Sequence, residues 1–261
     1  MLSASVRKRS SLSRNARSAR RLSVTSRITF GGGENCWPVW SPDGSKIAWA
    51  SNRAGRYGIY LRLASGVGRE DSLEHAPTAD EGPWDWSRDG RLLLTAAQGP
   101  ANRWDIWSHP TTAEPSPTVF LQTEFSERNP RVSPDGRWIA YQSNESGRAE
   151  IYVQPYPGPG GKWQVSTGGG IQPQWRGDGK ELFYMAPDQS LMAVPVAAGE
   201  TFESGNPVAL FRARLTELSL TGCGWAVTSD GQRFLLNSPV GVVGAARFAV
   251  VTNWTSELGK K

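Results

Sequence analysis

The stretch SPDGSKIAWAS, residues 41–51, has a close copy in SPDGRWIAYQS, residues 133–143. A third copy, SRDGRLLLTAA, lies halfway between them at residues 87–97. An Asp-Gly pair anchors each copy, and with two further pairs the successive steps are 46, 46, 43 and 52 residues. Periods of this length are typical of solenoids, arrays and propellers, in which each repeat is one supersecondary unit. The five pairs are Asp43-Gly44, Asp89-Gly90, Asp135-Gly136, Asp178-Gly179 and Asp230-Gly231.

Each Asp-Gly pair lies between two short apolar stretches. A large apolar residue stands three positions before every Asp, and a Pro or Trp stands two positions earlier, which is the period of two expected of a strand. Ser, Pro, Asp and Gly suit the four positions of a tight turn, and a second apolar run follows at once. Each repeat is therefore predicted to begin with a hairpin. The residues three positions before Asp are Trp40, Trp86, Val132, Trp175 and Val227.

Two further strands are predicted in each repeat. A third begins about 15 residues after each Asp, as GIYLRL, WDIWSH, AEIYVQPY, SLMAVPV and RFAVVTNW. A fourth is visible in TVFLQT, WQVSTGGG and VALFRAR, and is predicted in the weakly patterned segment near residues 71–73. Four short strands per repeat, without a helical segment, predict an all-β fold: a β-propeller of five four-stranded antiparallel blades.

The two ends of the chain suggest how the ring closes. The fifth repeat lacks a fourth strand, whereas RITFGGG, residues 27–33, matches the fourth-strand segment QVSTGGG, residues 164–170. We predict that residues 28–30 complete the blade formed by residues 223–254, which would remove the exposed edges of the ring. The alternative is a fragment of a propeller with six or more blades. The expected organisation is a basic tail at residues 1–26, a single propeller domain at 27–258 and a short tail at 259–261.

Charge and composition narrow the functional classes. Residues 1–27 hold eight cations and no acid, whereas the other 234 residues hold 21 Lys and Arg against 24 Asp and Glu. The basic character thus belongs to the tail, and no nucleic-acid partner is expected for the body of the protein. No apolar run approaches the roughly 20 residues of a membrane span, and no signal peptide is recognised, so the compartment stays unassigned. Two cysteines are too few for a disulfide scaffold.

The repeat also carries a family resemblance. The pattern W-S-P-D-G-x-x-I-A-x-x-S, the later I-Y and the closing T-x-G-G-like segment resemble the blades of TolB-type, WD-repeat-like propellers. The segment from NPRVSPDGRWIAYQS to GKELFY, and the terminal VVTNW, resemble the C-terminal propellers of some bacterial membrane-bound serine/threonine kinases. This resemblance, over about residues 27–258, implies a sensor or protein-contact module without catalytic residues. Related propellers are often extracytoplasmic.

Motifs for catalysis are missing from the sequence. There is no Gly-x-Ser-x-Gly nucleophile elbow and no kinase signature. The two histidines, His75 and His109, fall in polar sequence and are expected at the surface. One Asp per blade cannot cluster the six to eight oxygens that calcium takes, so no metal, cofactor or catalytic residue is predicted. Cys36 and Cys223 occupy equivalent repeat positions and are expected to be unpaired thiols, with a metal or redox pair as the alternative.

The tryptophans supply the remaining candidates. Trp40, Trp86 and Trp175 share one repeat position and are predicted to pack between blades. Trp37, Trp104 and Trp163 fall outside that position and are candidates for an exposed aromatic binding surface, with core packing as the alternative. We expect a monomeric, non-catalytic module that binds a protein or peptide on one face or at the mouth of the central channel. The competing class is an enzyme, or a propeller that gates one.

Overall fold

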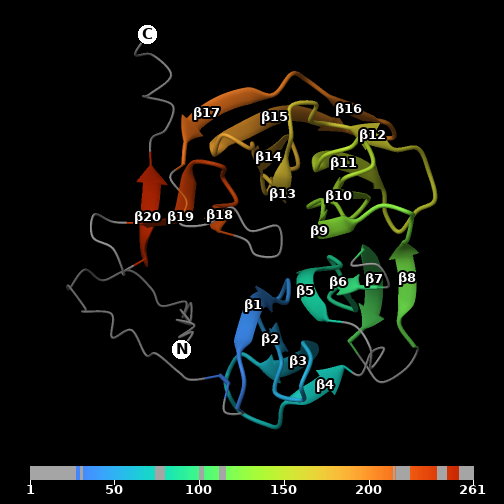
Figure 1. Ribbon diagram of the computed structural model, residues 1–261, viewed down its shortest axis with the longest axis vertical. Helices are drawn as coiled ribbons and strands as arrows, with labels where there is room; N and C mark the ends of the chain where they lie inside the picture. Colours follow the sequence, from blue (N-terminus) through green and yellow to red (C-terminus); the bar gives the residue numbers. More distant parts are fainter. Residues whose placement is uncertain are drawn as a thin grey trace, which may run out of the picture.

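The computed structural model describes residues 28–29, 32–73, 80–99, 103–111, 116–213, 215, 224–239 and 246–252. Within these residues every regular element is a strand. The strands form five antiparallel units that follow one another in chain order around an arc, as Figure 1 shows. The all-β propeller fold predicted from the repeat is confirmed. Both predicted tails, residues 1–26 and 259–261, lie outside the described residues.

Each of the first three blades is a sheet of four strands. The first blade contains β1 (Asn35–Trp40), β2 (Lys46–Ser51), β3 (Gly58–Leu63) and β4 (Asp71–Leu73). The second contains β5 (Glu81–Trp86), β6 (Leu92–Gln98), β7 (Trp104–Pro110) and β8 (Thr118–Leu121). The third contains β9 (Glu127–Val132), β10 (Trp138–Ser143), β11 (Glu150–Pro155) and β12 (Trp163–Gln164). All four strands expected per repeat are therefore present, including the weakly patterned β4.

The last two blades depart from this plan. The fourth contains β13 (Ile171–Trp175), β14 (Glu181–Met185), β15 (Ser190–Ala198) and β17 (Val208–Arg212), with β16 (Phe202–Ser204) pairing with the far end of β15. The fifth contains β18 (Trp225–Val227), β19 (Arg233–Pro239) and β20 (Ala246–Thr252). The strand β16 was not predicted, because the long β15 reads as one apolar stretch with no signal for two partners.

The Asp-Gly turns are built alike in all five blades. In the first blade the Gly44 amide donates to the Ser41 carbonyl at 2.8 Å, and the Asp43 carboxylate accepts from the Ser41 hydroxyl at 2.6 Å and the Ser45 amide at 3.0 Å. The glycine has φ +69°, a left-handed conformation that side chains disfavour. The glycines of the other four turns have φ between +70° and +77° and donate the equivalent bond: Gly90, Gly136, Gly179 and Gly231. The predicted turns are confirmed.

The innermost strand of a blade bends at a fixed place. Trp37, Asn129 and Gln172 each stand six positions before a turn Asp, have φ between +51° and +56°, and precede a proline. The strand pairing shifts register at these points, which is the mark of a β-bulge. Proline is tolerated because these strands are sheet edges, where an amide donor is not needed for the ladder.

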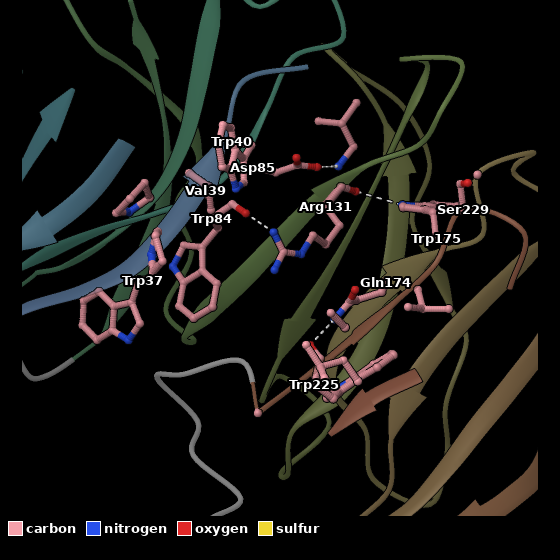
Figure 2. A pocket seen from close by; sticks show the side chains of 18 of the residues that line it. Trp37, Val39, Trp40, Trp84, Asp85, Arg131, Gln174, Trp175, Trp225 and Ser229 are labelled. Carbon is pink, nitrogen blue, oxygen red and sulfur yellow. Dashed lines mark hydrogen bonds between the residues drawn. The ribbon is translucent and has the colours of Figure 1, made fainter. Parts of the chain in front are cut away.

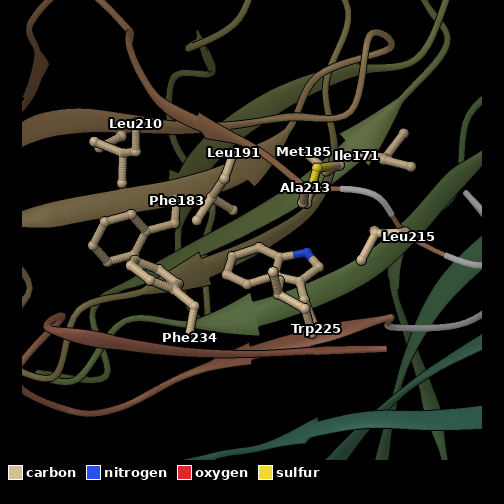
Figure 3. Close-up of a cluster of buried hydrophobic side chains, with 11 residues drawn as sticks. Ile171, Phe183, Met185, Leu191, Leu210, Ala213, Leu215, Trp225 and Phe234 are labelled. Carbon is tan, nitrogen blue, oxygen red and sulfur yellow. The ribbon is translucent and has the colours of Figure 1, made fainter. Parts of the chain in front are cut away.

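Neighbouring blades share their apolar cores. Phe183 of β14 packs with Trp225 and Phe234 of the fifth blade in one buried cluster, which Figure 3 shows from close by. Its ring centroid lies 5.3 Å from that of Phe234, in an edge-on arrangement. Trp86, at the start of the second blade, is 1% exposed and packs against Ala48 and Ile59 of the first. Inter-blade packing of Trp86 is thus confirmed.

The same positions show which described blades lack a neighbour on one side. From the second blade on, the residue three positions before the turn Asp packs backward on the preceding blade. In the first four blades, the residue five positions after that Asp faces the next blade. Ala48, Leu94, Ala140 and Phe183 occupy the forward-facing position and are all 0% exposed, but their counterpart Leu235 in the fifth blade is 40% exposed. Trp40, the backward-facing residue of the first blade, is 43% exposed. The prediction that Trp40 packs between blades is therefore wrong.

The predicted closure by residues 28–30 is not seen in the part of the chain that the structure describes. Ile28 and Thr29 lie outside any strand, and Phe30 is not described. Ile28 is buried against Ile47 and Trp49 of the first blade. Its carbonyl accepts from Arg62 Nη1 at 3.1 Å. The described part of this segment thus packs on the first blade rather than pairing with β20.

Replacing a turn glycine tests the turn geometry. Nothing lies within 4 Å of a Cβ added at Gly44 or at Gly199, but only Gly44 has a positive φ. We expect Gly44→Ala to lower the free energy of unfolding by about 1 kcal/mol through backbone strain alone, and Gly199→Ala to leave it nearly unchanged. Urea unfolding of the two variants measures the difference, and equal midpoints would contradict the left-handed turn.

A pair of tryptophan substitutions tests whether the first blade lacks a neighbour on its exposed side. Trp86→Ala removes a fully buried ring and is expected to cost about 3 to 5 kcal/mol in unfolding free energy. Trp40→Ala, at the equivalent position, is expected to cost about 1 kcal/mol or less, because its side chain lacks a neighbouring blade. Chemical denaturation followed by circular dichroism gives both values. A similar loss for the two variants would mean that the ring is closed in solution.

Candidate functional site

The innermost strands of all five blades surround one cavity of about 990 Å³. Its wall includes β1, β5, β9, β13 and β18, and Figure 2 shows the side chains that these strands direct toward it. The residue four positions before the turn Asp lines the cavity in every blade. These residues are Val39, Asp85, Arg131, Gln174 and Ala226. The repeat therefore places one variable side chain per blade on a common surface.

Aromatic side chains form one side of the channel. Trp37 is half-buried and stacks on Trp84, with ring centroids 6.1 Å apart and planes at 21°, and it lies 5.4 Å from the ring of Tyr57. Gly82 lies directly beneath the Trp37 ring, where an added Cβ would come within 2.4 Å of Cε3. The left-handed backbone at Trp37 directs this ring over Gly82, which leaves space for it because it has no side chain.

Polar contacts join the second and third blades at the channel wall. The Asp85 carboxylate accepts from the Val132 amide at 2.8 Å and pairs with Arg88 at 3.1 Å. Arg88 also donates to the carbonyls of Ser133, at 3.0 Å, and Val132. Arg131 donates from Nη1 to the Trp84 carbonyl. Asp85 and Arg88 are thus used in holding the blades together.

Further contacts continue around the wall (Figure 2). Trp175 donates from Nε1 to the Arg131 carbonyl at 3.0 Å, and Gln174 donates from Nε2 to the Trp225 carbonyl at 2.8 Å. Trp175 is half-buried and packs against the apolar cluster that contains Trp138 and Ala140 of the third blade, so its predicted packing between blades is confirmed. The channel wall is therefore a fixed surface supported by hydrogen bonds between successive blades.

Ionisable groups on the described wall are few: Asp85, Arg88, Arg131 and the thiol of Cys36. Cys36 is a free, half-buried cysteine, and its pKa is raised to about 12, chiefly by burial and further by the negative charge of Glu34. The thiol is therefore neutral at physiological pH and a poor nucleophile. Its predicted counterpart Cys223 lies outside the described residues.

The three predicted binding aromatics lie in different places. Trp37 lines the channel. Trp104 is only 6% exposed and packs with Trp84 and Ala96, which is the core packing that the sequence left open as the alternative. Trp163 is half-buried on the outer strand β12 and packs at 5.5 Å from the ring of Trp138, away from the channel. The structure brings only Trp37 to the candidate site, and a binding role for it stays a prediction.

The histidine prediction also needs correction. His109 was expected at the surface but is 1% exposed, with Nε2 at 2.5 Å from Glu81 Oε1, and Thr95 donates to the same oxygen at 2.6 Å. This group lies between β5, β6 and β7 and bonds the sheet internally. His75 is outside the described residues. In the described ranges, no three His, Cys, Asp or Glu side chains gather as a metal site would require, and no helix could cross a membrane.

Sequence reasoning missed Arg131, Asp85 and Gln174. A signal was present, because the position four residues before each turn Asp changes from apolar to acidic, basic and amide across the blades. Such variation between two apolar positions of one strand indicates a face that packing does not constrain.

No protein-family model matches the sequence. Solved structures with similar folds include TolB from Acinetobacter baumannii, with a TM-score of 0.63 and 17% identity over 84% of this chain and 52% of that one. A TolB candidate from Agrobacterium tumefaciens has a TM-score of 0.57 and 19% identity over 72% of this chain and 71% of that one. This chain spans about half the length of the first TolB structure. The predicted TolB-type propeller fold is confirmed.

Peptidases are also among the similar folds. A puromycin-hydrolyzing peptidase from Mycobacterium tuberculosis has a TM-score of 0.53 and 16% identity, over 88% of this chain and 49% of that one. At such identities the likeness concerns the fold alone.

The raised pKa of Cys36 predicts that its thiol is alkylated slowly. In a Cys223→Ser variant, the Cys36 thiol should react with iodoacetamide at pH 8 about a hundredfold or more slowly than free cysteine, because very little thiolate forms below pH 10. The rate, followed by mass spectrometry, should keep rising up to about pH 12. Adding Glu34→Gln should increase it slightly, since a negative charge is removed. A rate like that of free cysteine at pH 8 would contradict the buried, neutral thiol.

Proposed function

We propose that this protein is a non-catalytic propeller module that binds a segment of another protein in its central channel. The observation that carries the proposal is the composition of the channel wall. Five blades contribute one side chain each from equivalent positions, beside the partly exposed tryptophans Trp37, Trp40 and Trp175. Aromatic side chains that combine large area with low conformational entropy are favoured at protein-binding sites. The likeness to TolB propellers supports the proposal.

The chemistry of the wall favours binding over catalysis. Its described carboxylate, Asp85, is already bonded to an amide and a guanidinium, and its thiol is neutral. His109, the described imidazole, is enclosed in its own blade with Glu81. None of these groups is placed as a general base facing open space in the channel.

A second candidate function is a propeller that gates a peptidase. The similarity to the peptidase structures supports it, since this chain matches 49% of the puromycin-hydrolyzing enzyme. Such a function would require a separate catalytic domain. It would still use the channel as a passage for peptides.

More specifically, we propose that the protein acts as a sensor attached to a signalling enzyme. The resemblance of residues 129–184 to propellers of bacterial membrane-bound serine/threonine kinases supports this role. In that setting, occupation of the channel would be the event that is sensed.

Selection of peptides tests the channel proposal. The full chain is panned against a random dodecapeptide phage library, and enriched peptides are synthesised and titrated by fluorescence anisotropy. Trp37→Ala should weaken their binding at least about tenfold, because an exposed aromatic contact is lost. Trp163→Ala, which removes a half-buried ring outside the channel, should leave binding unchanged.

Thermal unfolding of both variants verifies that each remains folded at the assay temperature. A library without enriched binders, or binders indifferent to Trp37→Ala, would overturn the proposed site.

A further inference from the structure

The packing of the blades leaves part of the hydrogen-bonding capacity of the Arg131 guanidinium unused. Its backbone is fixed on both sides, since the Arg131 carbonyl accepts from Trp175 and the next amide donates to Asp85. Its guanidinium has one described acceptor, the Trp84 carbonyl, which is bonded through Nη1. Within the described residues Nε and Nη2 have no acceptor, and the side chain is only half-buried. A rigid strand thus presents a partly satisfied cation to the cavity, as Figure 2 shows.

On the described wall, no carboxylate pairs with the positive charge of Arg131. The described wall holds one carboxylate, Asp85, whose Oδ2 is 3.1 Å from Arg88 and 2.8 Å from the Val132 amide. Arg131 forms no ion pair with any described residue, so the described wall has a net charge of +1 at this place. A cation desolvated in a partly enclosed channel gains most from an anion that replaces its lost water.

We propose that the channel selects acidic peptide segments, with one Asp or Glu carboxylate binding Arg131 and neighbouring apolar side chains contacting Trp37 and Trp40. This inference rests on the proposed function and names the chemistry of its ligand. The carboxylate oxygens match the fork of Nε and Nη2, which is the geometry of a two-bond arginine–carboxylate pair. Trp40 is 43% exposed and supplies apolar surface on the same cavity.

The described wall holds too few cations for a polyanionic ligand. Nucleic acid and polyphosphate binding need several arginines or lysines that follow the backbone. On the described wall only Arg88 accompanies Arg131, and Arg88 is bonded to Asp85 and to the carbonyls of Val132 and Ser133. One guanidinium without a described ion pair, beside apolar rings, therefore fits a single carboxylate on a largely apolar chain.

Two matched peptide pools test the proposal on the full chain. Both contain acetylated, amidated hexapeptides of random order: one built from Asp, Glu, Phe, Leu, Trp and Gly, and the other with Asn and Gln in place of the acids. Peptides retained by the immobilised protein are quantified by mass spectrometry. The acidic pool should be retained about tenfold better, a gain typical of hydrogen bonds to a charged group. A single-stranded dT12 oligonucleotide serves as a third probe.

Variants assign the preference to one side chain. Arg131→Gln should abolish the acidic preference, Arg131→Lys should keep part of it, and Arg91→Gln should not change it, because Arg91 is an exposed arginine outside the channel wall. Thermal unfolding identifies any variant that has lost its fold, and Arg131→Lys retains a cation for that comparison.

The outcomes separate this inference from the proposed function. Equal retention of both pools, with loss of both in Trp37→Ala, keeps the peptide channel but overturns its acidic selectivity. Retention of neither pool overturns the proposed function itself. An acidic preference that survives Arg131→Gln places the anion site elsewhere and refutes the role of Arg131. Preferential retention of dT12, lost in Arg131→Gln, would identify a nucleic-acid site instead of a peptide site.

Discussion

The structure depends on one contact between successive blades, in which a large side chain before each Asp-Gly turn packs backward onto the sheet before it. A single four-stranded blade has two faces and cannot bury both alone. Trp86 packs on the first blade and Val132 packs on the second, and both side chains are almost completely buried. Without this contact the innermost strands would not be held at fixed spacing, and no channel wall would exist.

The hairpin turns make this contact repeatable. The bonds from Ser41 and Ser45 to the Asp43 carboxylate, and the left-handed Gly44, set the register of β1 against β2. Because the register is the same in each blade, the residue three positions before Asp meets the previous blade from the second blade on. The residue before that one always meets the channel. A local turn thus determines both the long-range packing and the composition of the candidate site.

The fold could be predicted from the sequence because its determinants are local and repeated. The exposure of individual side chains could not, since it depends on which neighbour is present. Trp40 and Trp86 occupy the same repeat position, yet one is 43% exposed and the other 1%. Trp104 was a candidate for the surface because it falls outside the repeat position of Trp86, but a cluster with Trp84 encloses it. Arg131 escaped notice because its signal is the variation of one strand position across the blades and not a motif within one repeat. Only the assembled wall reveals that it lacks an ion pair among the described residues.

The bulges at Trp37, Asn129 and Gln172 have a consequence for how the channel can recognise a ligand. Each bulge and its following proline interrupts the row of amides along an inner sheet edge. An extended segment in the channel would find no continuous backbone ladder to join, so strand addition is disfavoured there. If the channel binds as proposed, its selectivity would come from side chains that vary without disturbing the sheet. Substitutions at a few inward positions would then change the partner, while the residues that specify the fold stay the same.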